Sequence, residues 1–360
     1  MQRFTLSRRF GSALALASLA LATGGCETMS PNREAAQKRW NLARSDVKAR
    51  LAADQLSAGD YLEASAAARE ARALAPDDAD KTLLAARVEL AQGDAEAAER
   101  LLDDDPTVDD RPQAAYLRGV IHEQRRQWPA ALEQFERADL LEPEQLTYAL
   151  ARSNALLQLG RAAEALRVLT ERSDQFRSAP AFQAAVAECH EQQGDWASAA
   201  DTWAGLTEDD PDGAMGRRHA AALERSERWA EAARALETLL QRVPATEAPA
   251  LQLRIARAQL ETRDSTAAQR TLRALLEHDP RDPEALMLTV RALALQERYA
   301  DAAEVAELLL EDQPRDPAAL EFAASMHFRA GSGNRARRLA ERLQGVDVEN
   351  PIAREILSSR

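Results

Sequence analysis

Few side chains in this sequence could take part in covalent chemistry. There are two cysteines, and Cys189 stands directly before His190. A cysteine activated by a nearby histidine is a common nucleophile. Successive residues of a helix point about 100° apart, however, so within a helix the two side chains would face different neighbours. We favour this second interpretation and predict no catalytic residue.

Metal binding is the other chemistry that these residue types allow. The histidines show no metal-ligand spacing, and three of them fall at equivalent places of a repeat, which favours a packing role; the five are His122, His190, His219, His278 and His327. The acidic run from Asp103 to Asp110 lacks the central glycine and closing glutamate of a calcium loop, so we expect a solvated turn. We therefore predict no metal, no cofactor and no small-molecule substrate, and we expect that the protein is not an enzyme.

Alanine recurs along the chain at an interval of 33 to 36 residues. These ladder alanines are Ala64, Ala98, Ala131, Ala165, Ala199, Ala232, Ala268, Ala302 and Ala336. A period of this length over most of a chain indicates a repeat array, in which each unit packs on its neighbours, rather than one globular core.

Each period carries the signals of two amphipathic helices. In the third period, helical spacing of apolar residues runs from Ala114 to Gln124 and from Trp128 to Ala138, ahead of Pro143. Small residues on the first helix should face the ladder alanine, because helices approach to about 8–10 Å only where the crossing side chains are small. Carboxylates on the helix surfaces are expected to be i, i+4 partners of arginine.

Two sets of larger residues are expected to fill the rest of the core. One set lies three residues before a ladder alanine and comprises Tyr61, Trp128, Trp196, Trp229 and Tyr299. The other lies four residues after a ladder alanine and includes Leu102, Phe135, Leu169, Trp203, Leu236 and Leu272.

This arrangement resembles the tetratricopeptide repeat (TPR) family. The family pattern is best matched by Tyr116, Gly119, Trp128, Ala131, Phe135, Ala138 and Pro143. The resemblance implies an all-α, right-handed α-solenoid of about nine helix pairs over residues 45–350, with a short capping helix over 351–360. Pro106 comes early in the second repeat, so that repeat's second helix should be a turn short, and the junction near Asp103–Asp110 is a candidate hinge.

Residues 1–25 resemble a bacterial lipoprotein signal peptide. Arg3, Arg8 and Arg9 precede an apolar run at 10–22 that is too short to span a bilayer, and Cys26 follows. The resemblance implies an acylated Cys26, palmitate included, and residues 26–44 would form a tether and leading helix. Such a protein would be anchored at the periplasmic face of the outer membrane. An ordinary secretory signal, with Cys26 incidental, is the alternative.

The composition argues against several classes of partner. The formal net charge is −13, and an acidic surface disfavours nucleic acid and anionic lipid head groups. Hydrophobic residues make up 45% of the chain, with much alanine, but aromatic residues only 4%. That balance suits close packing of helices better than a sheet-rich enzyme.

In TPR proteins the first helices of the pairs line a concave groove. Carried onto this chain, the resemblance implies groove positions at Tyr116, Asn154, Arg217, Arg257, Met287 and Arg291. The N-terminal half would be apolar through residues such as Leu150 and Leu157. The lysine–asparagine clamp with which some TPR domains hold a C-terminal carboxylate is absent. The three arginines either pair with glutamates such as Glu224 and Glu261 or meet an acidic or extended peptide.

We therefore expect a non-catalytic scaffold or adaptor in the bacterial envelope that binds a partner protein or extended peptide. Outer-membrane or secretion-type assembly is one setting that similar lipoproteins suggest. Two alternatives stay open: a peptidoglycan- or glycan-associated factor, and an enzyme with an unrecognised site near Cys189.

Overall fold

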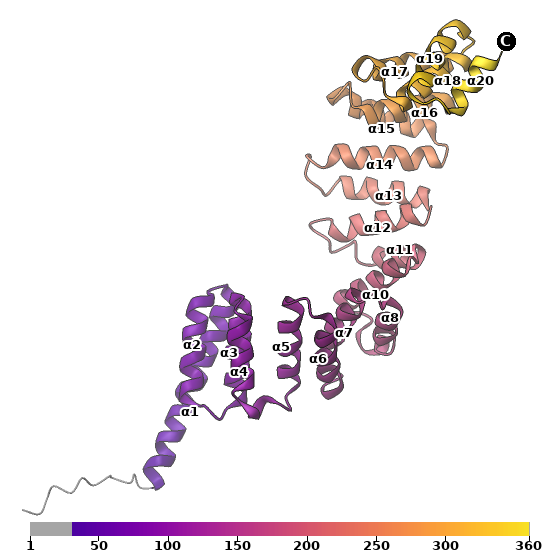
Figure 1. Cartoon of the computed structure of the whole chain (residues 1–360). Helices are drawn as coiled ribbons and strands as arrows, with labels where there is room; N and C mark the ends of the chain where they lie inside the picture. Colours follow the sequence, from indigo (N-terminus) through magenta and orange to yellow (C-terminus); the bar gives the residue numbers. More distant parts are fainter. Residues whose placement is uncertain (1–30, 360) are drawn as a thin grey trace, which may run out of the picture. The chain divides into compact units, whose positions relative to one another are not determined.

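The computed structural model describes residues 31–359. Within these residues the chain is helical and contains no strand, and most of its helices form pairs joined by short turns (Figure 1). The predicted fold class, an all-α solenoid of helix pairs with a short C-terminal helix, is confirmed. The predicted signal peptide, the acylation of Cys26 and the tether as far as Ser30 lie outside the described residues.

The chain divides into two compact units, residues 1–108 and 109–360. The boundary falls inside the acidic run Asp103–Asp110. The helices of the first unit are α1 (Pro31–Ala58), α2 (Tyr61–Leu74), α3 (Ala79–Gln92), α4 (Ala95–Asp103) and the 3-10 helix η1 (Pro106–Val108).

The second unit holds the remaining helices. They are α5 (Pro112–Gln124), α6 (Trp128–Leu141), α7 (Leu146–Gln158), α8 (Ala162–Thr170), α9 (Ser173–Phe176), α10 (Pro180–Gln193), α11 (Trp196–Ala204), α12 (Ala214–Arg225), α13 (Trp229–Leu240), α14 (Ala248–Glu261), α15 (Ser265–His278), α16 (Pro283–Leu295), α17 (Tyr299–Asp312), α18 (Pro317–Arg329), α19 (Gly333–Val346) and α20 (Pro351–Ser358).

Helix lengths follow the local signals only in part. The early Pro106 predicts a short second helix in the second repeat, and α4 has nine residues where α2 and α6 have fourteen. The leading segment continues into the first repeat as one helix, α1, of 28 residues. The sequence did not predict that α8 and α11 would also stop after nine residues, or that the four-residue α9 would follow α8.

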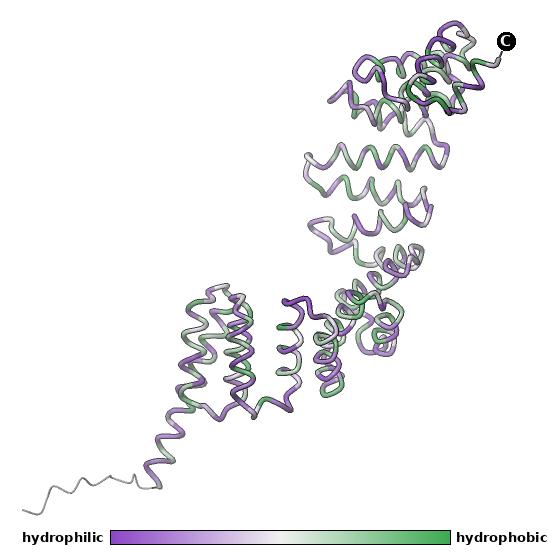
Figure 2. The backbone as a smooth tube through the Cα atoms, in the orientation of Figure 1, coloured by the Kyte–Doolittle hydropathy of each residue, from purple (hydrophilic) through white to green (hydrophobic). Residues whose placement is uncertain are grey.

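The core of each unit lies between the paired helices. All nine ladder alanines have an exposed fraction of 0%, as the packing argument requires. Apolar and polar residues accordingly alternate along the helices (Figure 2). The residues four positions after the ladder alanines are also buried, and Phe135 and Trp203 are among the largest fully buried side chains.

The prediction for the other set of large residues is confirmed only in part, because Trp229 and Tyr299 pack against the core with partly buried rings. Tyr61 is 43% exposed, and Trp128, Trp196, Trp229 and Tyr299 are only partly buried. Each of them is the first residue of its helix, where one side of the ring faces solvent. Two of these rings also form cation–π interactions. The Arg225 guanidinium lies 4.4 Å from the centre of the Trp196 ring, and that of Arg329 lies 5.7 Å from the centre of the Tyr299 ring.

The turns inside the pairs need a residue with positive φ. Gly93, with φ of 87°, ends α3 in this way, since glycine has no Cβ to clash. Four pairs meet the same requirement without glycine, at Arg126, Glu227, Arg263 and Glu297, whose φ values are 56° to 59°. The turn geometry is therefore set by the pairing of the helices and not by glycine alone.

Candidate functional site

The residues predicted to line the groove lie on first helices of the second unit, namely α5, α7, α12, α14 and α16. We call the side of these helices that carries the predicted residues, together with α10 between α7 and α12, the first-helix face. All residues of these helices are described. Backbone contacts join α7 to α10 and α14 to α16, and side-chain contacts join the others.

At α5 and α7 the face is largely closed by packing. The Tyr116 ring is half-buried, with its centre 5.8 Å from that of Phe135 and 5.3 Å from that of Tyr148. Leu157 is only 6% exposed. No large apolar side chain of α5, α7 or α10 is exposed. The expectation of an open apolar half was therefore wrong, because these side chains pack between neighbouring helices.

Asn154, the polar residue predicted for this part of the first-helix face, already has a hydrogen-bond partner. The Asn154 side-chain amide on α7 donates a hydrogen bond of 2.9 Å to the Glu123 carboxylate on α5. Burial raises the pKa of Glu123, although the bond from Asn154 acts in the opposite direction. Burial likewise raises the pKa of Tyr116. Asn154 thus links two repeats and is not held ready as a peptide clamp.

The three predicted arginines each have a carboxylate partner on a neighbouring repeat. Arg217 on α12 lies 2.8 Å from Glu247, the residue before α14. Arg257 on α14 pairs with Glu284 on α16, and Arg291 on α16 lies 3.0 Å from Glu261 on α14. Of the two interpretations of these arginines, the structure shows the paired one. Their side chains nevertheless stay between 36% and 49% exposed.

Two more arginines of the face escaped the sequence analysis. Arg218 on α12 binds Glu188 and Glu191 on α10, and its guanidinium also stacks 4.4 Å from the centre of the Trp203 ring. The Trp203 indole N–H donates to Glu191 at 2.7 Å.

Arg254 on α14 pairs with Glu224 on α12 at 2.8 Å, so Glu224 is not the partner of a predicted groove arginine. Opposite charges thirty residues apart recur in this way at 188 and 218, 217 and 247, 224 and 254, and 261 and 291. This spacing of thirty residues could have predicted ion pairs between neighbouring repeats, whereas the sequence analysis expected i, i+4 pairs within one helix.

Met287 is separated from this row of charges. It lies on α16, one turn before Arg291, but lines a small cavity of about 110 Å³ together with Leu309 of α17 and Ala319 of α18. It packs partly buried against the C-terminal core. The structure therefore does not bring Met287 together with the arginines.

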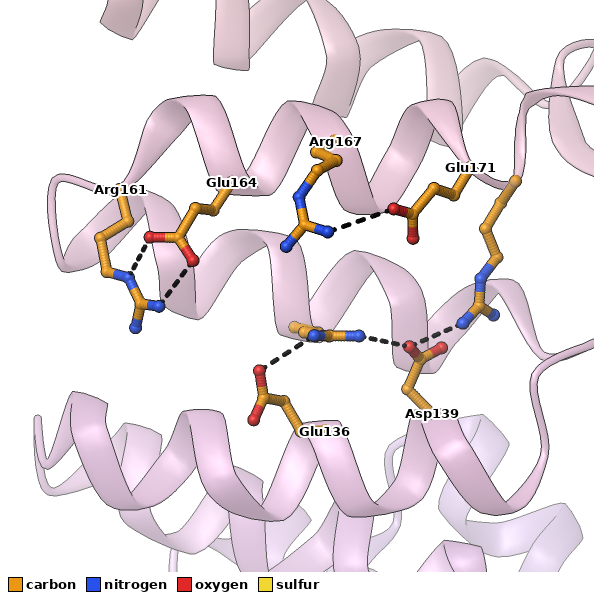
Figure 3. Close-up of polar contacts among 8 residues, drawn as sticks. Glu136, Asp139, Arg161, Glu164, Arg167 and Glu171 are labelled. Carbon is orange, nitrogen blue, oxygen red and sulfur yellow. Dashed lines mark hydrogen bonds and ion pairs between the residues drawn. The ribbon is translucent and has the colours of Figure 1, made fainter.

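A second charged cluster lies between α6, α7 and the end of α8. The Asp139 side chain is fully buried, and its carboxylate accepts hydrogen bonds from Arg152 at 3.1 Å and Arg172 at 2.8 Å (Figure 3). Arg152 also reaches Glu136 at 3.0 Å. Around it, Arg161 pairs with Glu164 and Arg167 with Glu171, along α8 and the residues that flank it. This cluster ties three helices together and has a structural role.

The candidate nucleophile Cys189 is enclosed in the core. It is 0% exposed, and its Sγ lies 3.8 Å from the Ser153 Oγ. Burial raises the pKa of the thiol to about 11, so it stays protonated at neutral pH. His190 points elsewhere, with its Nδ1 3.5 Å from Asp195. The two side chains face different neighbours, as the helical spacing predicts.

The acidic run and the histidines form no metal centre in residues 31–359. No group of three possible ligands occurs among them. Asp105 accepts hydrogen bonds from Thr82 and Thr107, both at 2.6 Å, and Asp109 pairs with Arg118 at 2.9 Å. His122 and His327 bind neighbouring Gln127 and Glu307. In the same residues, no helix is both long and apolar enough to cross a membrane.

Comparison with known proteins agrees with this fold. Residues 253–317 match the tetratricopeptide repeat family, and residues 72–227 match the N-terminal domain of the ESX-1 type VII secretion system protein EccA1. No curated protein matches the chain.

Solved structures of other helical repeat proteins are similar to this chain. The C-terminal part of a TPR repeat-containing protein from Cytophaga hutchinsonii is 15% identical, with 67% of this chain and 98% of that one covered and a TM-score of 0.52. A TPR protein from Parabacteroides merdae is 12% identical over 70% and 99% of the two chains, with a TM-score of 0.45. The Naa15/Naa10 complex bound to HypK-THB is 17% identical over 87% of this chain, with a TM-score of 0.45; the match covers 48% of that chain, so this protein spans about half its length.

The matched repeats, the buried ladder alanines and the recurring helix pairs agree with one another. Residues 253–317 thus match the tetratricopeptide repeat family, and helix pairs of the same kind recur through the described residues. These repeats form a scaffold for protein–protein interaction.

Proposed function

We propose that this protein is a non-catalytic adaptor, anchored by lipid in the bacterial envelope, that binds a partner protein or extended peptide through the first-helix face of its second unit. The observation that carries the proposal is the row of half-exposed arginine–glutamate pairs that joins α12, α14 and α16. These pairs present three positive and three negative groups to a segment lying across the three helices.

The weakness of these pairs makes them suitable for exchange with a partner. An exposed ion pair contributes only about 0.2–1 kcal/mol, because water already solvates both charges. A carboxylate of the partner can take the place of Glu284 on Arg257 at little cost. A partner segment with alternating charges therefore fits this face better than a purely acidic one, since the glutamates it displaces then gain basic partners.

The proposed setting is supported by two further observations. Residues 72–227 resemble the N-terminal domain of a secretion system protein, which favours a secretion-type assembly. The N-terminal run that ends at Cys26 favours export and acylation. The glycan-associated alternative is supported only by this predicted location in the envelope. An enzyme using Cys189 would need a thiolate that the buried site disfavours.

Affinity pull-down from an envelope extract tests the binding face. Three variants separate recognition from stability: Arg257→Glu, Glu284→Arg, and the two together. Each single change places like charges opposite each other, whereas the double variant restores an ion pair with the opposite orientation. If Arg257 contacts the partner, both Arg257→Glu and the double variant lose partner bands. Full recovery in the double variant would show that the pair serves only to join repeats, and unchanged bands in all three would reject this face.

Lipid attachment is tested separately. Labelling of growing cells with a palmitate analogue should mark the wild-type protein and leave the Cys26→Ser variant unmarked. The variant should also move from the membrane fraction to the soluble fraction. An unlabelled wild-type protein would reject the anchor but leave the adaptor function standing.

A further inference from the structure

The outer side of α1 carries a row of exposed apolar and basic residues. Arg33, Trp40, Arg44, Val47 and Leu51 follow one another at intervals of seven, four, three and four residues, which places them on one face of the helix. We call this row the α1 stripe. It extends over roughly 27 Å at about 1.5 Å per residue.

The α1 stripe has no partner in the described residues. Helix α1 packs on α2 and α3 with its other side, where Ser45 and Ala52 are fully buried. Trp40 is 61% exposed, Val47 64% and Leu51 42%. Single apolar residues scattered over a surface need no explanation, but Trp40, Val47 and Leu51 are aligned on one helix face.

The charge of α1 is opposite to that of the whole chain. The helix has six basic and three acidic side chains, in a chain with a formal net charge of −13. One of these acids, Asp46, is held by Lys81 at 2.8 Å, and one base, Lys48, by Glu70 at 2.6 Å.

The basic groups on and beside the stripe remain available. Among the described residues no carboxylate forms an ion pair with Arg33, Lys38, Arg39, Arg44 or Arg50. Arg44 and Arg50 interact only at longer range with Glu70 and Asp46, which Lys48 and Lys81 already hold. The acidic residue in register with the stripe is Asp54, which comes about one turn after Leu51. The positive charge is therefore concentrated around Trp40.

We propose that the α1 stripe lies on an anionic lipid bilayer, with Trp40, Val47 and Leu51 at the head-group boundary and the arginines on the lipid phosphates. Tryptophan favours this boundary, and basic side chains beside it bind anionic head groups. A second copy of the chain fits less well, because two basic stripes would repel. The overall acidity of the protein does not prevent this contact, since salt at physiological strength screens charges beyond about 8 Å. The contact is independent of the proposed adaptor function and of the state of Cys26.

Co-sedimentation with lipid vesicles tests the proposal. The chain from Glu27 onward is used, because the apolar run at 10–22 would itself enter a bilayer, and every contact given above lies within residues 31–359. It should bind vesicles of equal parts phosphatidylcholine and phosphatidylglycerol, and bind much less to phosphatidylcholine alone. Each basic residue near an anionic surface is worth roughly fivefold in partition coefficient. Replacing Arg33, Arg44 and Arg50 by glutamine should therefore weaken binding roughly a hundredfold.

A matched control removes the same charge elsewhere. Arg263, Arg273 and Arg338 are exposed residues of the second unit, and their replacement by glutamine should leave binding within about twofold of wild type. The fluorescence of the wild-type protein should shift to the blue on anionic vesicles, and Trp40→Phe should abolish that shift while circular dichroism stays unchanged.

Three results would overturn the proposal. Equal binding to both kinds of vesicle would remove the role of charge, and equal loss in the two triple variants would remove the role of α1. Absence of vesicle binding, together with a dimer in sedimentation equilibrium that Trp40→Ser dissociates, would assign the stripe to a second copy. None of these results bears on the pull-down of a partner through α12, α14 and α16.

Discussion

Replacing Gly119 by alanine should destabilise the protein, because the Phe135 ring occupies the place of the added side chain. Gly119 lies inside α5 and is buried, and a Cβ added there would stand 2.5 Å from the Phe135 Cδ1 and still closer to Cε1. Ordinary carbon contacts are about 3.5–4.0 Å, so the overlap is about 1 Å. Phe135 is fully buried and packs on Tyr116, which leaves the ring no room to move.

The expected cost of Gly119→Ala follows from two opposing effects. Overpacking of a core costs about 1–3 kcal/mol, and the severe overlap here favours the upper end. Alanine in a helix interior regains about 1 kcal/mol relative to glycine. We therefore expect a net loss of about 2 kcal/mol. In a Phe135→Leu background the overlap disappears, and the same substitution should be neutral or stabilise by up to about 1 kcal/mol.

Urea unfolding followed by circular dichroism measures these changes. Repeat proteins can unfold in more than one step, so hydrogen exchange of the α5 and α6 amides should accompany it. Gly345→Ala in the last turn of α19 is the control, since a Cβ there meets nothing within 4 Å and only a gain of at most about 1 kcal/mol is expected. A Gly119→Ala protein as stable as wild type would refute the reasoning. So would an equal loss from Gly119→Ala in the wild-type and Phe135→Leu backgrounds.

Three further predictions concern buried ionisable groups. In a Cys26→Ser chain, Cys189 should resist alkylation at pH 8 until the protein unfolds, because its pKa is raised to about 11; rapid labelling of the native protein would contradict this prediction. The raised pKa contributes stability below the unfolded-state value near 8.5, and that contribution is lost as the pH rises through 11. Burial lowers the pKa of His219, so its NMR titration midpoint should lie below 6.5. The neutral histidine contributes stability above pH 6.5, and this contribution should be lost as the pH falls through the midpoint. A midpoint at or above 6.5 would contradict the prediction. Asp139→Ala should cost about 3 kcal/mol in urea unfolding, because it leaves Arg152 and Arg172 without their buried carboxylate. The more exposed Glu136→Ala should cost under about 1 kcal/mol, and equal costs would contradict the assignment.

The sequence by itself determined the repeat and its packing. Small residues recur where helices cross, and nothing larger fits there whatever the neighbours, so the alanine ladder could be read directly and is buried throughout. The early Pro106 likewise acts through local backbone chemistry, and the shortened α4 follows from it. The same is true of Cys189 and His190, which diverge because they are adjacent on a helix.

The tertiary structure alone decided which surface groups meet. Leu157 and Tyr116 were expected in an open groove, but their exposure depends on how tightly α7 packs on its neighbours. Arg257 finds Glu284 across a gap of twenty-seven residues, because stacking places successive first helices side by side. A long, flexible arginine has carboxylates within reach on its own helix and on the next, and only the stacking distance settles the choice. The small side chains thus define the repeat period in the sequence, whereas the pairing of charged side chains depends on how the helices stack.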